Sequence, residues 1–311
     1  MYDVADVQSS CSCRVARGVG VRFGAKVDNY GEQVTRYGIA EPTMACEAAG
    51  FDSVWLSDHV VMPSRTNSPF PFSDDGQAHW RPEDPWFDPV TCLGFLGALT
   101  QRVELAVGVL IGTLRQPVVV AKEIATVDRL TSGRVVLGVG AGWLAEEFEA
   151  LGVPFAARGE RLDEWIRLVR ACWTGRPGAM AGRFYTLPPG VLCYPVPARP
   201  VPVLVGGMSS AALTRAALVG DGWVPLLRPC DTVTTVVGEG LARIREIAAG
   251  AGRDLTGWRC VYNADTPERV APLLPDLEVL GVTDVVVEVD YSAADGAMTA
   301  LALLRENVRG D

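Results

Sequence analysis

An aspartate and a histidine stand side by side where a short apolar segment ends, and together they could carry acid–base chemistry. Asp58 and His59 directly follow the apolar residues 53–57, and the chain contains only two histidines. Imidazole gains and loses a proton near neutral pH, so His59 is the candidate general acid. Adjacent side chains on a strand face opposite ways, so we expect Asp58 to contact a cofactor. The alternative is a pair that only caps a turn.

Glycine-rich turns follow two later apolar segments. They comprise Gly140, Ala141 and Gly142 in one case and Gly206, Gly207 and Met208 in the other. Glycine lets a backbone approach a ligand closely, and the amides of a following helix can hold a phosphate. The turn at 206–207 is therefore the phosphate candidate, with an ordinary tight turn as the alternative for each cluster. The GxGxG spacing of 138–142 does not match the GxGxxG dinucleotide motif.

The elements that position these residues alternate between short β-branched segments and stretches of helical periodicity. Strands are expected at 19–23, 53–57, 103–110, 134–140, 201–205, 222–226, 258–262 and 283–289. Helices are expected at 32–49, from Pro89 behind an Asp88 cap, and at 117–130, 158–173, 209–219, 232–249, 267–280 and 294–308. Eight such units predict a (β/α)8 TIM barrel, which gathers all strand exits on one face. A doubly wound sheet would accept the same alternation.

Two insertions rich in proline and glycine interrupt the alternation. Residues 60–87 follow strand 2, and residues 176–200 precede strand 5. Long loops inside a compact domain usually act as lids or binding loops, which is what we expect of both. Residues 1–17 are expected to be a disordered N-terminal extension, and 18–311 a single domain.

Composition excludes several classes of function. A net charge of −9 and a pI near 4.9 argue against nucleic acid or an anionic membrane as a partner. The eight cysteines show no CxxC pair and no histidine at metal-ligand spacing, so no metal site is expected. We expect reduced thiols in a cytoplasmic protein.

Several motifs taken together carry a family resemblance. They read GFDSVWLSDH at 50–59, VGVL at 107–110, AKEIATVDRLTSGR at 121–134, LGVGAGW at 137–143, EEFEALG at 146–152, PVLVGG at 202–207 and GDGW at 220–223. The chain resembles the luciferase-like monooxygenase superfamily over about residues 19–290, and within it the oxidoreductases that use the deazaflavin coenzyme F420. The resemblance implies a TIM barrel with the deazaflavin across the carboxyl ends of the strands.

The resemblance also implies roles for individual residues. His59 matches the catalytic position, and Gly108-Val109 matches a site where the family often carries a non-proline cis peptide. The cofactor contacts expected are Asp58, Gly108, Val109, Thr113, Gly140, Ala141, Gly142, Gly206, Gly207 and Met208. Arg158 and Arg161 could reach the cofactor tail, with solvated ion pairs as the alternative. Glu146 and Glu147 are expected to form an exposed helical start.

The chain departs from the sugar-phosphate dehydrogenase branch of the family. Trp143 stands where that branch has a carboxylate, and Pro63 where it has a tryptophan, so a sugar phosphate is not the expected substrate. Trp143 and Met62 should instead line an apolar pocket for a bulky organic molecule.

Three functions follow from this resemblance. The first is hydride transfer from reduced F420 to an organic substrate, by reduction of a C=C or C=N bond. The second is an FMN-dependent monooxygenase, which would need a flavin reductase as partner. The third is a non-catalytic barrel that binds a flavin-like ligand or serves as a subunit. A homodimer is expected because relatives often form one.

Overall fold

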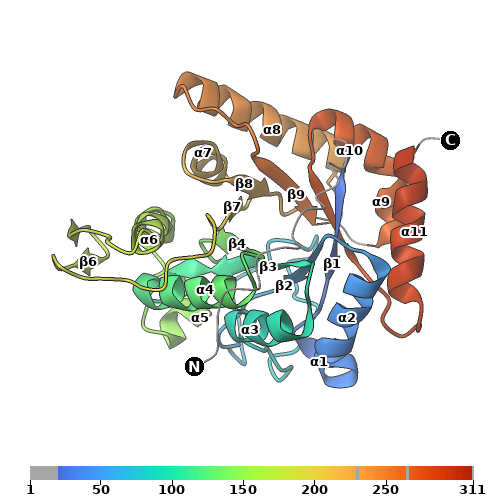
Figure 1. Cartoon of the computed structure of the whole chain (residues 1–311), viewed down its shortest axis with the longest axis horizontal. Coiled ribbons are helices and arrows are strands. Elements are labelled where there is room, and N and C mark those ends of the chain that lie inside the picture. The colour runs from blue at the N-terminus through green and yellow to red at the C-terminus, as the bar shows by residue number, and fades with distance from the viewer. Residues whose placement is uncertain (1–19, 229–230, 264–265, 310–311) are drawn as a thin grey trace, which may run out of the picture.

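Eight parallel strands close into a barrel in the computed structural model, which describes residues 20–228, 231–263 and 266–309 (Figure 1). The barrel strands are β1 Arg22–Lys26, β2 Ser53–Leu56, β3 Glu104–Ile111, β4 Val135–Gly140, β7 Val203–Gly206, β8 Gly222–Val224, β9 Arg259–Asn263 and β10 Asp284–Glu288. Each strand pairs with its neighbours in the order β1-β10-β9-β8-β7-β4-β3-β2. The predicted TIM barrel is confirmed. The expected extension at 1–17 lies outside the described residues.

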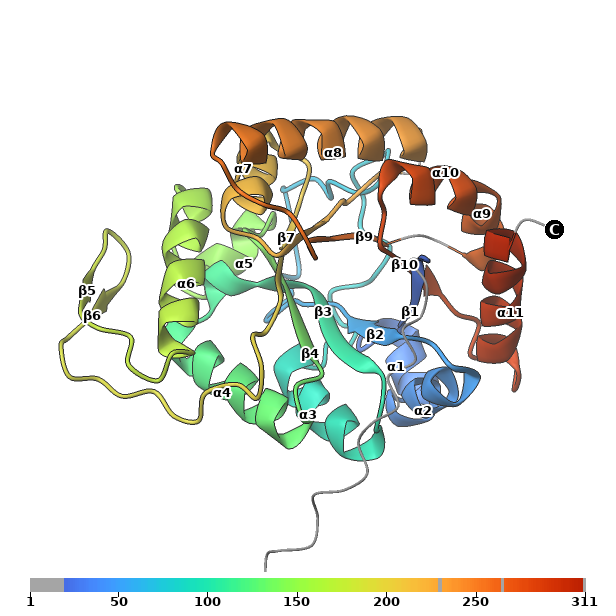
Figure 2. The same ribbon diagram turned by 45° about the horizontal axis from the view of Figure 1, so that its top comes forward.

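Helices surround the barrel, as Figure 2 shows. They are α1 Gly31–Tyr37, α2 Ala40–Ala49, α3 Pro89–Leu99, α4 Pro117–Leu130, α5 Ala145–Ala150, α6 Arg158–Cys172, α7 Ser210–Leu218, α8 Val233–Gly250, α9 Pro267–Val270, α10 Leu274–Leu280 and α11 Gly296–Arg309, with short 3-10 turns η1 Gly112–Leu114 and η2 Ala271–Leu273. Caps fix several starts. Asp88 accepts from the Thr91 amide before α3, and Ser209 accepts from the Ala212 amide before α7.

Two helices predicted as continuous are broken. The expected helix at 32–49 is α1 and α2, because Gly38 ends α1 with a φ of 65° that L-residues rarely adopt. The expected helix at 267–280 is α9 and α10, which the 3-10 turn η2 separates. The first strand also begins at Arg22, three residues later than predicted.

The two insertions differ in form and position. Residues 176–200 hold a small antiparallel pair, β5 Met180–Ala181 and β6 Thr186–Leu187, which lies outside α6 and away from the barrel (Figures 1 and 2). Residues 60–87 form neither helix nor strand beyond an isolated bridge between Tyr30 and Trp86. Only the insertion at 60–87 reaches the cavity described below.

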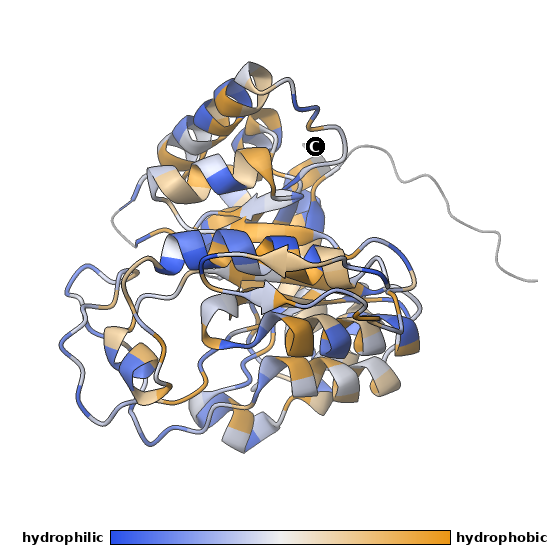
Figure 3. Cartoon of the chain, turned by 90° about the vertical axis from the view of Figure 1, so that its left-hand side faces the viewer, coloured by the Kyte–Doolittle hydropathy of each residue, from blue (hydrophilic) through white to orange (hydrophobic). Residues whose placement is uncertain are grey.

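Apolar side chains fill both sides of the strands. The barrel interior holds Trp55, Ala106, Val136, Leu204, Val224, Val261 and Val286, all buried. A larger cluster packs between the strands and the helices. Figure 3 shows the same separation, with hydrophobic strands at the centre and mixed helices around them. Burial of each large side chain stabilises the fold by roughly 1.5–3 kcal/mol.

Ion pairs close the amino-terminal end of the barrel. Arg259, at the start of β9, lies 2.5 Å from Asp284 and 3.0 Å from Glu104. Arg22 of β1 lies 2.8 Å from Glu104. These charges join β1, β3, β9 and β10 at the end where no cavity is needed. None of the helices in the described ranges is long and apolar enough to cross a membrane.

Candidate active site

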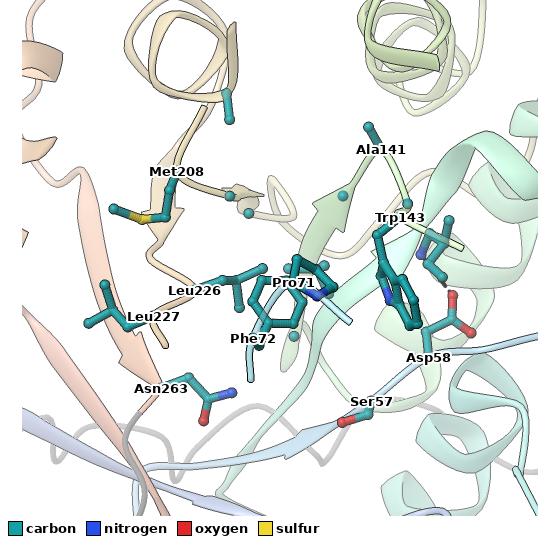
Figure 4. Close-up of a pocket in the computed structure, with 18 of the residues that line it drawn as sticks. Ser57, Asp58, Pro71, Phe72, Ala141, Trp143, Met208, Leu226, Leu227 and Asn263 are labelled. Carbon is teal, nitrogen blue, oxygen red and sulfur yellow. Dashed lines mark hydrogen bonds between the residues drawn. The ribbon is translucent and has the colours of Figure 1, made fainter. Parts of the chain in front are cut away.

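A cavity of about 1090 Å³ opens at the carboxyl ends of the barrel strands. Its lining includes most of the site residues expected from the sequence, namely Asp58, His59, Gly108, Val109, Gly140, Ala141, Gly142, Trp143, Gly206, Gly207 and Met208. Figure 4 shows Trp143, Ala141 and Met208 around it. Pockets for one drug-sized ligand measure roughly 300–1000 Å³, so this cavity has room for part of a large cofactor and a substrate.

Two expected residues lie outside the lining. Thr113 is buried behind the wall, where its hydroxyl donates to the Ala141 carbonyl oxygen at 3.0 Å. Met62 is half-buried in the insertion and does not reach the cavity. Thr113 therefore supports the strand-4 turn from behind, and the apolar lining comes from other residues of the insertion.

His59 is held by a carboxylate that the sequence placed on the surface. Glu147 of α5 is fully buried, and its Oε2 lies 2.8 Å from His59 Nδ1. Its Oε1 accepts from the Val60 amide at 2.6 Å and from the Val61 amide at 3.3 Å. The expectation of an exposed helical start was wrong for Glu147, because the carboxylate points inward to these donors. Among the described residues, His59 Nε2 has no hydrogen-bond partner, and the His59 ring lines the cavity.

Asp58 does not offer its carboxylate to the cavity. Its side chain is fully buried, and its oxygens lie 2.6 and 2.8 Å from the Arg115 guanidinium, with the Ile111 amide donating at 2.7 Å. Figure 4 shows this carboxylate turned away from Phe72. Burial alone would lower the pKa of Arg115, but Asp58 and Asp88 outweigh it and raise that pKa. The two neighbouring side chains face opposite ways as expected, and the Asp58 carboxylate anchors the end of β3 through Arg115 and the Ile111 amide.

The cavity floor is built on a cis peptide. The Gly108–Val109 bond is cis, as the resemblance implied, and the β3–β4 register shifts between Val107 and Leu110. The half-buried Val109 side chain lines the cavity. A Cβ at Gly140 or at Gly206 would come within 2.7 Å of Val109. These glycines thus leave space for the Val109 side chain. From the sequence, we expected that space to serve the approach of a ligand.

Five aromatic rings form one side of the cavity, which we call the aromatic wall. They belong to Tyr30, Phe70, Trp80, Trp86 and Trp143. Tyr30 stacks on Trp86 with centroids 4.1 Å apart, and Phe70 meets Trp80 at 5.0 Å and Trp143 at 5.3 Å in edge-to-face contacts. Three of the rings come from the insertion at 60–87, for which the sequence offered no motif.

His59 lies among three indoles of this wall. Its ring centroid is 4.8 Å from that of Trp86, 5.7 Å from that of Trp80 and 5.9 Å from that of Trp143. Such surroundings exclude water from the imidazole and leave it in contact with apolar ring faces.

A half-buried lysine, Lys26, lies at the edge of the aromatic wall. Lys26 Nζ donates to Glu288 at 2.9 Å and to the Tyr30 hydroxyl at 3.3 Å, and it lies 3.5 Å from Asp28. Burial acts to lower the Lys26 pKa, but Tyr30 and the two carboxylates outweigh it and hold that pKa well above its ordinary value. The Tyr30 hydroxyl also lies 3.2 Å from His79 Nε2. The exposed His79 side chain thus also lines the cavity.

The opposite side of the cavity holds the start of α7 and several arginines. Gly207, with a φ of 114°, gives its amide to the Val224 carbonyl, so the turn itself is already hydrogen-bonded. The first amides of α7, which follow Ser209, have no intrahelical partner by geometry. Arg158 lines the cavity and donates to the Gly142 carbonyl oxygen. Arg161 does not reach it and instead lies over the Phe184 ring.

The described residues hold no cluster of three or more histidine, cysteine or acidic side chains that could bind a metal ion. The cavity brings together an imidazole held by a carboxylate and an apolar wall, with arginines and a helix start on the far side.

Comparisons with known proteins identify relatives of this chain. An uncharacterised protein of Mycobacterium tuberculosis is 35% identical over 262 residues, which cover 83% of this chain and 88% of the relative. An F420-dependent glucose-6-phosphate dehydrogenase of Nakamurella multipartita is 36% identical over 208 residues, 66% of this chain and 56% of the relative.

A solved structure shares the fold. The monooxygenase RslO1 of Streptomyces bottropensis superposes with a TM-score of 0.71 at 20% identity, covering 93% of this chain and 99% of that one. The family model for luciferase-like monooxygenases matches residues 21–301. The chain therefore belongs to the luciferase-like monooxygenase family of oxidoreductases.

Proposed function

We propose that this protein is an F420-dependent oxidoreductase that transfers a hydride to a small organic substrate, by reduction of a C=C or C=N bond. The observation that carries the proposal is His59, whose Nδ1 is bound to buried Glu147 and whose Nε2 is left for a cavity with Val109 as its floor. A relative named as an F420-dependent dehydrogenase supports the choice of cofactor.

The residues of the cavity fit a deazaflavin. The Gly108–Val109 segment supplies an apolar surface on which a planar ring system could lie, and Gly140 and Gly206 leave space for the Val109 side chain. The helix start after Ser209 and the Arg158 guanidinium are the donors that a phosphate or an acidic tail requires. When bound in the reduced state, the deazaflavin supplies the hydride.

The protein's own residues position a proton at the site and exclude water from it. Glu147 fixes the orientation of His59, which holds a proton at Nε2 in its charged form and accepts one there in its neutral form. The indoles of Trp80, Trp86 and Trp143 exclude water from this nitrogen. Asp58 and Arg115 hold the end of β3 rigid beneath the site.

The alternative is an FMN-dependent monooxygenase with a flavin reductase as partner. The family description and the fold shared with a monooxygenase favour it, because both cofactors present a flat tricyclic ring. We also propose a cytoplasmic location, no nucleic-acid or membrane partner in view of the net charge of −9, and a homodimer.

A binding titration tests the choice. The purified protein is titrated separately with oxidised F420 and with FMN, and binding is followed by quenching of ligand fluorescence. We expect F420 to bind at least tenfold more tightly, after which reduced F420 is offered with unsaturated substrates. Preference for FMN would favour the monooxygenase, and binding of neither would favour a non-catalytic barrel.

A further inference from the structure

We propose that the aromatic wall is the substrate subsite and that it accepts a planar, uncharged, unsaturated ring compound. The proposal rests on the function proposed above and names the class of substrate for the same cavity.

The rings of the aromatic wall lack the cover that core side chains have. None of the five belongs to either hydrophobic core cluster of the described residues. Four of them are half-buried, and all five line the cavity. Large apolar surfaces gathered at a cavity mark a binding site for an apolar ligand.

The angles between the rings favour a flat ligand. Phe70 meets Trp80 at 80° and Trp143 at 65°, and Trp80 meets Trp86 at 80°. Walls set at such angles present faces and edges to the same space, which are the two contacts that an aromatic ring makes best. A planar unsaturated ring can offer its face to one of these rings and its edge to another, whereas a saturated ring has neither a π face nor an aromatic edge.

The charges at this end of the cavity favour a neutral ligand. Lys26 is the only lysine in the lining, and it is already committed to Glu288 at 2.9 Å and Asp28 at 3.5 Å. An anionic substrate at this end of the cavity would meet the Glu288 carboxylate, while the Lys26 ammonium beside it is already paired. A cationic substrate would meet the Lys26 ammonium. Either charge would lose its hydration without a new partner.

Position links the subsite to the chemistry. His59 lies within 6 Å of Trp80, Trp86 and Trp143, measured between ring centroids. A ring held by these indoles therefore lies beside the imidazole that would exchange a proton with it. The aromatic wall contains no arginine or lysine, so the phosphate of a sugar phosphate would find no cation on it.

Three matched probes test the proposal by titration calorimetry at pH 7. We would use 2-naphthol as the planar neutral probe, 2-naphthalenesulfonate as its anionic counterpart and trans-2-decalol as its saturated counterpart. The protein is titrated alone and after saturation with oxidised F420. We expect 2-naphthol to bind at least tenfold more tightly than either of the others. Equal binding of all three, or tightest binding of the sulfonate, would overturn the proposal.

A substitution locates the binding. Trp80→Leu removes the ring that contacts Tyr30, Phe70 and Trp86, and should weaken 2-naphthol about tenfold while decalol binding changes little. Phe95→Leu is the matched control, since Phe95 is 52% exposed on α3 and outside the cavity. Unchanged naphthol binding in a Trp80→Leu protein with wild-type circular dichroism would place the probe elsewhere and remove the subsite.

The outcomes separate this proposal from the proposed function. Discrimination among the probes without F420 binding would leave the subsite standing and remove the cofactor assignment. Tight F420 binding without discrimination among the three probes would support the cofactor assignment and remove the subsite. If Trp80→Leu does not fold, the comparison of the three probes on the wild-type protein still decides the question.

Discussion

The two sides of the cavity are built by different means. The floor and the α7 side come from the barrel itself, where Gly140 and Gly206 leave space for Val109 and Ser209 caps a helix. The aromatic wall comes largely from an insertion without helix or strand, and its rings contact one another more than the core. The difference suggests that the barrel side serves the cofactor and the insertion side selects the substrate.

Loss of the imidazole should have the largest effect. His59→Ala should lower kcat by roughly a hundredfold to ten-thousandfold, the usual contribution of a positioned acid or base. The Kd for oxidised F420 should change little, because the floor is untouched. Steady-state kinetics and the fluorescence titration measure the two quantities. Unchanged turnover would remove His59 from the mechanism.

Loss of the Glu147 carboxylate, which holds the imidazole, should have the second-largest effect on kcat. Glu147→Gln should lower kcat about tenfold to a hundredfold and alter the pH profile of kcat, because the ring loses its charged partner at Nδ1. Glu146→Gln is the matched control on the same helix, since that carboxylate binds Asn67 and Ser68 and does not contact His59. Equal pH profiles for the two variants would leave Glu147 with a structural role alone.

A substitution on the cofactor side of the cavity should change the affinity for F420 and leave proton transfer unchanged. A Cβ at Gly206 would come within 2.7 Å of Val109, so Gly206→Ala should displace that side chain and weaken F420 about tenfold. Val109→Ala in the same chain should restore much of the loss. An unaltered Kd in Gly206→Ala would show that the cofactor does not rest on Val109.

The smallest effect concerns stability against pH. Burial, and then Lys26, lower the pKa of His79 below its ordinary value, so the unfolded chain binds a proton that the folded chain resists. Stability should therefore be full above the ordinary imidazole range and fall as the pH drops through it. His79→Gln should reduce this fall by a few tenths of a kcal/mol, since the side chain is exposed. Urea denaturation at pH 5 and pH 8 measures it, and identical profiles would contradict the assignment.

The barrel was predictable because its signals are local. Alternation of β-branched and helical segments fixed the eight units, and α4 begins and ends where its pattern predicted, at Pro117 and Leu130. The break at Gly38 was missed because the periodicity of residues 32–49 continues across it. The position of His59 just after the end of a strand also followed from the local pattern.

The pairing inside the site was not predictable in the same way. His59 and Glu147 are 88 residues apart, and nothing local distinguishes Glu147 from Glu146. The partnership of Asp58 with Arg115 likewise depends on where β3 ends relative to β2. Glycines at strand ends were recognised, but their neighbour Val109 was visible only in three dimensions.

The sequence by itself determined the barrel, the family and the strand exits that carry His59, Val109 and the glycine turns. Local periodicity and short motifs are enough for this, because they act within a few residues of one another. Only the tertiary structure decided that Glu147 holds the imidazole, that Asp58 is withdrawn into an ion pair and that the insertion provides an aromatic wall. Those contacts join residues distant in the chain, and their geometry is set by packing across the closed barrel.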